Sequence, residues 1–194
     1  MKEFIHNKVR VIDDFFAEFN QVQKLFAEKS FDFEHRLNTF LTRLSDYFEN
    51  RGESSKESEA LRIRNMLLTV KRGFDPSKME KISSGKGELL WGFSYNGIES
   101  LDRLLQEVYK KEITKLEEGE EILSNLILNL CQQGVLSNEK LKDLDTIPKI
   151  EVYWSYLLSQ NGSISVINKK LLTNLIPEDI YLLIEKVVCK ITTQ

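Results

Sequence analysis

Residues 3–28 read EFIHNKVRVIDDFFAEFNQVQKLFAE and decide the fold class of the chain. Apolar side chains recur in this stretch at alternating intervals of four and three residues, with polar Gln23 in one of the slots: Ile5, Val9, Ile12, Phe16, Phe19 and Phe26. This spacing places them on one face of an α-helix, because a helical turn takes about 3.6 residues. The stretch therefore predicts a long amphipathic helix whose apolar face must be covered by other helices.

The same spacing continues beyond this first helix. Residues 31–50 repeat it with Phe33, Leu37, Phe40, Leu44 and Tyr47, which favours a helical hairpin with the first helix. Ser54 and Glu57 match the capping box of a third helix, and Gly73 fits the position just after its end. We expect residues 1–73 to form an N-terminal helical lobe.

The centre of the chain changes character. Residues 74–87 show no regular apolar period, which predicts a basic linker. Large apolar residues then alternate with others over residues 88–95, as in a β-strand: Leu89, Trp91, Phe93 and Tyr95. Residues 163–167, Ser-Ile-Ser-Val-Ile, are also β-like. We expect residues 88–194 to form a C-terminal helical lobe with short β segments.

Most of the C-terminal lobe is predicted to be helical. Gly119 is expected to separate two helices, Pro148 to open another, and the last helix to run from about residue 178 to 192. The predicted fold class is therefore mainly α, with a helical hairpin plus a third helix, followed by a helical lobe with a small β element. The order of elements over residues 119–170 resembles that of a winged helix-turn-helix.

In a winged helix, residues 148–160 would be the recognition helix. This segment is nearly neutral and rich in aromatic side chains, whereas a helix that reads the major groove needs exposed Arg, Lys, Asn or Gln. The sequence therefore favours a winged helix that contacts protein. Such use resembles that of the accessory subunits of chromosome-structuring ATPase complexes.

The two cysteines, Cys131 and Cys189, each lie within an apolar helical pattern, so we expect core thiols and a reducing cytoplasm. The N-terminal residues lack the apolar run of a signal peptide. The most apolar window, residues 122–131, is shorter than the roughly 20 residues that a membrane helix needs. We expect a cytoplasmic protein with no membrane partner.

No pattern of catalytic residues stands out. The chain has two histidines, His6 and His35, which begin two different predicted helices. Gly85-Lys86-Gly87 lacks the remaining residues of a phosphate-binding loop, because position 80 is Glu and position 87 is not Ser or Thr. We therefore expect a protein that is not an enzyme and has no metal, no catalytic residues and no small-molecule cofactor.

Charge is concentrated in one segment. Residues 62–86 hold seven Lys or Arg and two acids, a formal charge of +5 in a chain of net charge −3. A basic face beside a flexible loop and an aromatic strand predicts one alternative function, sequence-tolerant nucleic-acid binding. The residues that would contact nucleic acid are Arg62, Arg64, Arg72, Lys78, Lys81 and Lys86. Alternatively, this segment could contact an acidic protein surface.

Aromatic residues on two predicted helices favour a different function. Interfaces between proteins are enriched in aromatic side chains. The candidate contact residues are Phe15, Phe19, Tyr153, Trp154 and Tyr156. Together with the lack of catalytic spacing, they predict a non-enzymatic subunit or adaptor of a larger cytoplasmic assembly. It would bind a protein partner or a second copy of itself.

Overall fold

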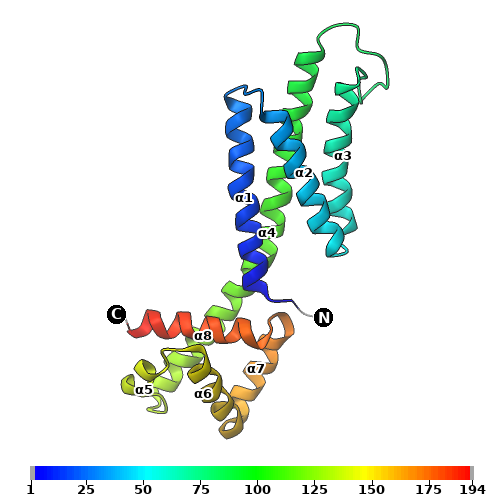
Figure 1. Cartoon of the computed structure of the whole chain (residues 1–194). Coiled ribbons are helices and arrows are strands. Elements are labelled where there is room, and N and C mark those ends of the chain that lie inside the picture. Colours follow the sequence, from blue (N-terminus) through cyan, green and yellow to red (C-terminus); the bar gives the residue numbers. More distant parts are fainter. Residues whose placement is uncertain (1–2, 193–194) are drawn as a thin grey trace. The chain divides into compact units, whose positions relative to one another are not determined.

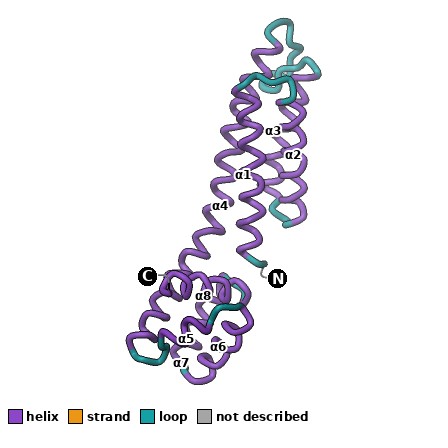
Figure 2. Tube along the Cα trace, turned by 60° about the vertical axis from the view of Figure 1, so that its left-hand side comes forward, coloured by secondary structure: helices purple, strands orange, loops and turns teal. Residues whose placement is uncertain are grey.

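The computed structural model describes residues 3–192, which fold into helices joined by short connections and by one longer loop between α3 and α4 (Figure 1). These residues form eight helices and no β-strand. Figure 2 shows the helices in purple and no strand colour. An isolated bridge between Phe74 and Lys81 is the one β-type pairing among them. The mainly α prediction is confirmed, and the predicted small β element is wrong.

The helices belong to two compact units. One unit, called here the middle unit, consists of Ile12–Val108. The other, called the terminal unit, combines the residues up to Val11 with those from Tyr109 onward. The first and the fourth helix each contribute residues to both units.

Four helices build the middle unit. They are most of α1 (Ile5–Ala27), α2 (Phe33–Asn50), α3 (Ser54–Lys71) and the first part of α4 (Lys86–Gln132). Helices α1 to α3 match the three helices predicted from the apolar spacing. Gly73 adopts a φ of 89° just after α3, in the left-handed region that glycine reaches without steric cost.

Aromatic rings hold the middle unit together. The Phe19 ring of α1 lies 5.6 Å from the Phe40 ring of α2, and both side chains are almost fully buried. The Trp91 ring of α4 lies 5.0 Å from Phe26 and stacks on Phe33 at 5.4 Å. Ring pairs at these separations add to the stabilisation from burial itself. The apolar face of α1 is thus covered by α2 and α4.

The remaining helices build the terminal unit. They are α5 (Asn138–Asp143), α6 (Ile147–Gln160), α7 (Gly162–Asn174) and α8 (Pro177–Thr192), packed with the last part of α4 and the first turns of α1. Their core consists of aliphatic side chains and one Trp, among them Leu123, Leu130, Ile150, Trp154, Ile164, Leu171 and Leu183. The Ser137 hydroxyl caps α5 by accepting a hydrogen bond from the Lys140 N–H at 3.2 Å.

Residues 88–95 form the first turns of α4, so the predicted strand is wrong. Inward positions of this helix carry small residues. Ser94 is buried, and a Cβ at Gly97 would come within 2.9 Å of the Ile63 side chain on α3. Small residues at close helix contacts hide the apolar helical period, which leaves the alternation of Trp91 and its neighbours as the visible pattern.

Gly119 does not separate two helices, because α4 runs through it without a break. A Cβ at this position would come within 2.8 Å of a Leu175 methyl carbon and 3.0 Å of a Leu183 methyl carbon. Glycine costs about 1 kcal/mol relative to alanine within a helix. Here the missing side chain of Gly119 lets two core leucines approach the backbone of α4.

Residues 163–167 also lie in a helix, α7. The Asn161 side chain caps it by accepting a hydrogen bond from the Ser163 N–H at 2.9 Å. Ile164 and Leu171 are buried two turns apart, whereas Val166 is exposed. Because residues 3–192 contain no strand that could form a wing, the winged-helix interpretation is wrong. The resemblance to accessory subunits that depended on it is lost as well.

Candidate functional site

The basic residues predicted to bind nucleic acid fall into two groups in the middle unit. Three of the six already have polar contacts. Arg62 forms an ion pair with Glu59 at 2.7 Å, Arg64 donates from Nε to the Asn38 side chain at 3.0 Å, and Lys86 donates to the Lys71 carbonyl at 2.8 Å.

Arg72, Lys78 and Lys81 form the other group, and all three are exposed. They lie in the connection between α3 and α4, which folds back on itself. The Ile82 N–H donates to the Gly73 carbonyl at 2.8 Å, and the Ser77 N–H donates to the Asp75 carboxylate at 2.8 Å. The connection is therefore a structured loop that presents three cations.

The aromatic strand predicted beside these cations does not form within residues 3–192. Trp91 is held between Phe26 and Phe33 and does not stand on an open strand. The exposed apolar side chains on or near the loop are instead Phe74 and Met79, which are 44% and 74% exposed. Base stacking by a Trp, Phe and Tyr strand is therefore lost as an argument.

The predicted contact residues differ sharply in exposure. Phe15, Phe19 and Trp154 are buried within their own units. Phe15 lies between the rings of Phe40 and Tyr47, and the Trp154 Nε1 donates to the Asn168 side chain at 3.2 Å. These three residues support the core. Tyr156 is exposed and Tyr153 is half-buried, so they present surface to a partner.

Helix α6 places the two tyrosines on an exposed face. Its inner face buries Ile150, Trp154 and Leu157. Val152 and Tyr156, one turn apart, are 72% and 56% exposed. We call Pro148, Val152, Tyr153 and Tyr156 the α6 face. They line an open depression of about 600 Å³.

Charged side chains surround the α6 face. Lys149 forms ion pairs with Asp145 at 2.8 Å and with Asp143 at 3.5 Å. The hydrogen bond from Lys149 holds the pKa of the Asp145 carboxyl below its usual value. The Lys140 Nζ lies 5.3 Å from the centre of the Tyr153 ring, a cation–π contact. The face thus has an apolar centre and a charged rim of both signs.

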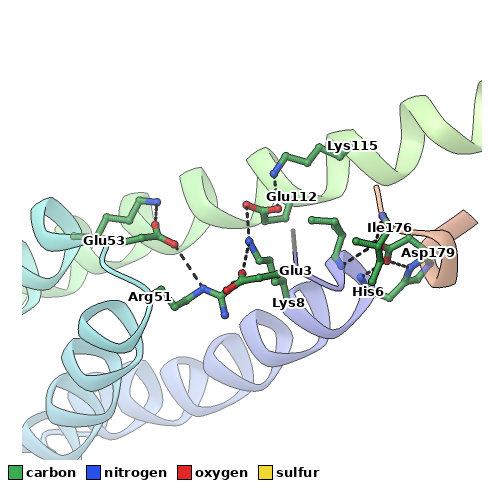
Figure 3. A network of polar contacts seen from close by, with 11 residues as sticks. Glu3, His6, Lys8, Arg51, Glu53, Glu112, Lys115, Ile176 and Asp179 are labelled. Atoms are coloured by element: carbon green, nitrogen blue, oxygen red, sulfur yellow. Dashed lines mark hydrogen bonds and ion pairs between the residues drawn. The ribbon is translucent and has the colours of Figure 1, made fainter. Parts of the chain in front are cut away.

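A buried carboxylate in the terminal unit escaped the sequence analysis. Asp179 of α8 is fully buried and accepts hydrogen bonds from the N–H groups of Ile5 and His6 at 3.1 and 3.0 Å (Figure 3). It also accepts from the Ile176 N–H at 3.4 Å and lies 2.7 Å from the His6 Nδ1. Asp179 therefore caps α1 and α8 together.

The environment of Asp179 favours its charged form. Burial alone would raise the pKa of its carboxyl, but the hydrogen bonds from His6, Ile5 and Ile176 outweigh burial and lower the pKa. The signal visible in the sequence was an acid in the first turn of the predicted last helix. Its role in α1 was invisible because Asp179 and His6 are 173 positions apart.

A second polar group lies nearby in Figure 3. The Glu112 side chain of α4 is buried and forms an ion pair with Lys115 at 2.7 Å. Lys8 of α1 lies 4.0 Å from Glu112 and 2.7 Å from Glu3. These pairs balance charge between α1 and α4 within the terminal unit, so they have a structural explanation.

Within residues 3–192, no three His, Cys, Asp or Glu side chains are grouped as metal ligands would be. In the same range, every helix is too short or too polar to cross a membrane. Cys131 is half-buried, and burial raises the pKa of its thiol. Cys189 is exposed, so its predicted place in the core is wrong.

No protein-family model matches this chain, and neither a curated protein sequence nor a solved structure matches it significantly.

Proposed function

We propose that this protein is a non-enzymatic helical subunit or adaptor of a larger cytoplasmic assembly, and that it acts through protein–protein contacts. The observation that carries the proposal is the α6 face. Val152 and Tyr156 leave more than half of their surface exposed on the outer side of a helix whose inner side is already buried.

The composition of the α6 face supports a protein partner. Protein interfaces combine an apolar centre with a polar rim, and tyrosine is among the residues that contribute most to binding energy. On the α6 face, Tyr153 and Tyr156 have ring centres 6.1 Å apart beside Val152. Ion pairs around Lys149 form the rim. A partner that covers this face would bury aromatic and aliphatic surface and leave the ion pairs solvated.

Affinity purification with a matched pair of variants tests the proposal. Val152→Lys places a charge in the α6 face, and Val166→Lys makes the same change on α7 at a similarly exposed position, 67% against 72%. Both variants should fold, because surface substitutions usually change stability by no more than about 0.5 kcal/mol.

The wild-type protein and the Val166→Lys variant should retain the same partner, quantified by mass spectrometry. Val152→Lys should bind it at least about tenfold more weakly, a loss of 1.4 kcal/mol or more, and should recover clearly less of it. Equal recovery with both variants would refute the proposal, as would the absence of any stoichiometric partner for the wild type.

Nucleic-acid binding is the second candidate function. The observation that favours it is the structured loop after α3, which presents Arg72, Lys78 and Lys81 as exposed cations. No acidic partner of these three residues occurs among the contacts within residues 3–192. Such a group suits the phosphate backbone, which supplies sequence-independent affinity.

A salt titration tests this second candidate. If three phosphates are contacted on duplex DNA, the logarithm of the binding constant should fall with a slope of about −2.7 against the logarithm of salt concentration. Changing Arg72, Lys78 and Lys81 to Gln should remove this binding, measured by fluorescence anisotropy. The control changes three other exposed lysines to Gln, Lys142, Lys169 and Lys170, and should leave binding intact. No binding of the wild type at low salt would eliminate the candidate.

A further inference from the structure

A groove opens in the middle unit between α2, α3 and the start of α4. Its volume is about 280 Å³. The apolar part of its lining includes Leu41, Leu67, Leu68 and Leu90. Ser94 of α4 also lines it, and this small side chain leaves space that a larger residue would fill. The groove is therefore a hollow with an apolar part, built from other residues than the α6 face.

Polar side chains line the edge of this groove and give it a positive balance. Arg64 donates to Asn38 at 3.0 Å through Nε. Lys71 forms an ion pair with Glu34 at 2.8 Å. His35 also borders the groove. The lining holds the two cations Arg64 and Lys71 and the one acid Glu34, so the edge suits an occupant that brings a carboxylate next to an apolar side chain.

Such a pair of side chains lies at the border of the same groove. Phe31 is fully exposed, at 104%, yet belongs to the groove's lining. Asp32 follows it, is exposed, and makes no side-chain capping bond to α2. A solvent-exposed phenylalanine costs free energy in proportion to the apolar area that stays in contact with water.

Local hydrogen bonds hold Phe31 in this position. The Ser30 N–H donates to the Leu25 carbonyl at 3.0 Å, and the Phe33 N–H donates to the Ser30 carbonyl at 3.2 Å. Lys29 adopts a φ of 51° in the turn. The loop between α1 and α2 is therefore an ordered turn that holds the ring outward, beside the groove and not in it.

We infer that the occupant of this groove is Phe31 of a second copy of the chain. A projecting side chain and a receiving groove on one face make that face self-complementary, which is the requirement for a two-fold symmetric dimer. Each copy inserts Phe31 into the groove of the other, and Asp32 meets the positive edge formed by Arg64 and Lys71. This contact uses other residues than the α6 face, so it can be tested independently of the proposed function.

The expected dimer is weak. A phenylalanine buries about 150–250 Å² when fully enclosed, so two of them with the groove walls stay near or below the roughly 1,200 Å² at which stable interfaces begin. We expect a dissociation constant on the order of 10 µM. Sedimentation velocity of the full chain from about 5 to 500 µM covers the range in which the monomer should convert to dimer.

Three variants test the contact in this assay. Phe31→Ala should raise the dissociation constant at least about tenfold. It should leave the circular dichroism spectrum unchanged, since the exposed ring supports no fold contact. Asp32→Lys and Lys71→Glu should each weaken self-association, because each juxtaposes like charges across the two-fold axis. Val152→Lys, on the α6 face, should have no effect and separates this contact from the proposed function.

Mixing Asp32→Lys with Lys71→Glu gives the decisive result. In a dimer of one Asp32→Lys chain with one Lys71→Glu chain, both contacts pair opposite charges, whereas each variant alone repels itself twice. The mixture should therefore form heterodimers at concentrations where neither variant associates alone.

A wild-type protein that stays monomeric at about 500 µM would overturn the inference. This is also the result expected if Phe31 folds into the groove of its own chain. Self-association that Phe31→Ala does not weaken, or a mixture that stays monomeric, would overturn it equally.

Discussion

Removing the carboxylate of Asp179 should destabilise the terminal unit by about 3–5 kcal/mol. Asp179→Ala leaves the buried N–H of Ile5 and the part-buried N–H of His6 without an acceptor. An unsatisfied buried group costs about 1–3 kcal/mol, and the His6 N–H adds toward the low end of that range. The capping bond to the Ile176 N–H is long, at 3.4 Å, and adds at the low end of the capping range of about 0.5–2 kcal/mol.

The assay follows the two units separately, because the chain has two tryptophans and each unit contains one of them, Trp91 or Trp154. In a Trp91→Phe background, fluorescence in a urea titration reports the terminal unit alone. Glu178→Ala, the exposed neighbour in the same helical turn, is the matched control and should cost under about 1 kcal/mol. A loss below about 1 kcal/mol for Asp179→Ala would refute the capping role.

The same site predicts a dependence of stability on pH. The folded-state pKa of Asp179 is lowered, so its contribution is fully present above the unfolded value of about 3.9 and is lost as the pH falls through the folded value. Asp179→Asn cannot titrate. The stability difference between wild type and this variant should therefore be smaller at about pH 3 than at about pH 5. A difference that is unchanged at pH 3 would contradict this account.

Two further substitutions test the packing of α4 and the cap of α5. Gly119→Ala should lower the free energy of unfolding, measured by urea titration, by about 1–3 kcal/mol, because its Cβ would meet Leu175. Gly92→Ala lies in the same helix with open space around it and should raise that free energy by about 0.5–1 kcal/mol. Equal effects of the two substitutions would contradict the packing role of Gly119. Ser137→Ala should cost about 1 kcal/mol by removing the acceptor of the Lys140 N–H, and an unchanged midpoint would show that the cap is not needed.

Much of the fold could be predicted from the sequence because several helices carry large apolar residues at regular spacing. Phe33, Leu37 and Phe40 mark α2 clearly, and all are buried. Capping residues such as Ser137 located the start of a short helix. The predictions failed where helix contacts use small residues. Ser94 and Gly97 hide the inward face of α4, and the segments 88–95 and 163–167, which are helical in the structure, were predicted to be β for lack of a visible helical period.

The candidate site was only partly predictable. Tyr153, Trp154 and Tyr156 are close in sequence, but a helix turns them to different sides, so Trp154 is buried and Tyr156 is exposed. Sequence alone does not say which side of an aromatic helix other helices cover. The sequence does not single out Phe31, because it lies outside the periodic pattern of apolar residues. Its exposure depends on a turn whose hydrogen bonds are visible only in the structure.

The α6 face as a protein-binding surface is the central claim, and site-specific photo-crosslinking in living cells tests it most directly. A photoreactive phenylalanine derivative replaces Val152 in one strain and Val166 in another, two exposed valines on α6 and α7. The claim predicts a discrete covalent adduct with another polypeptide from the first position and none from the second. Adducts of the same kind and yield from both positions, or from neither, would contradict it.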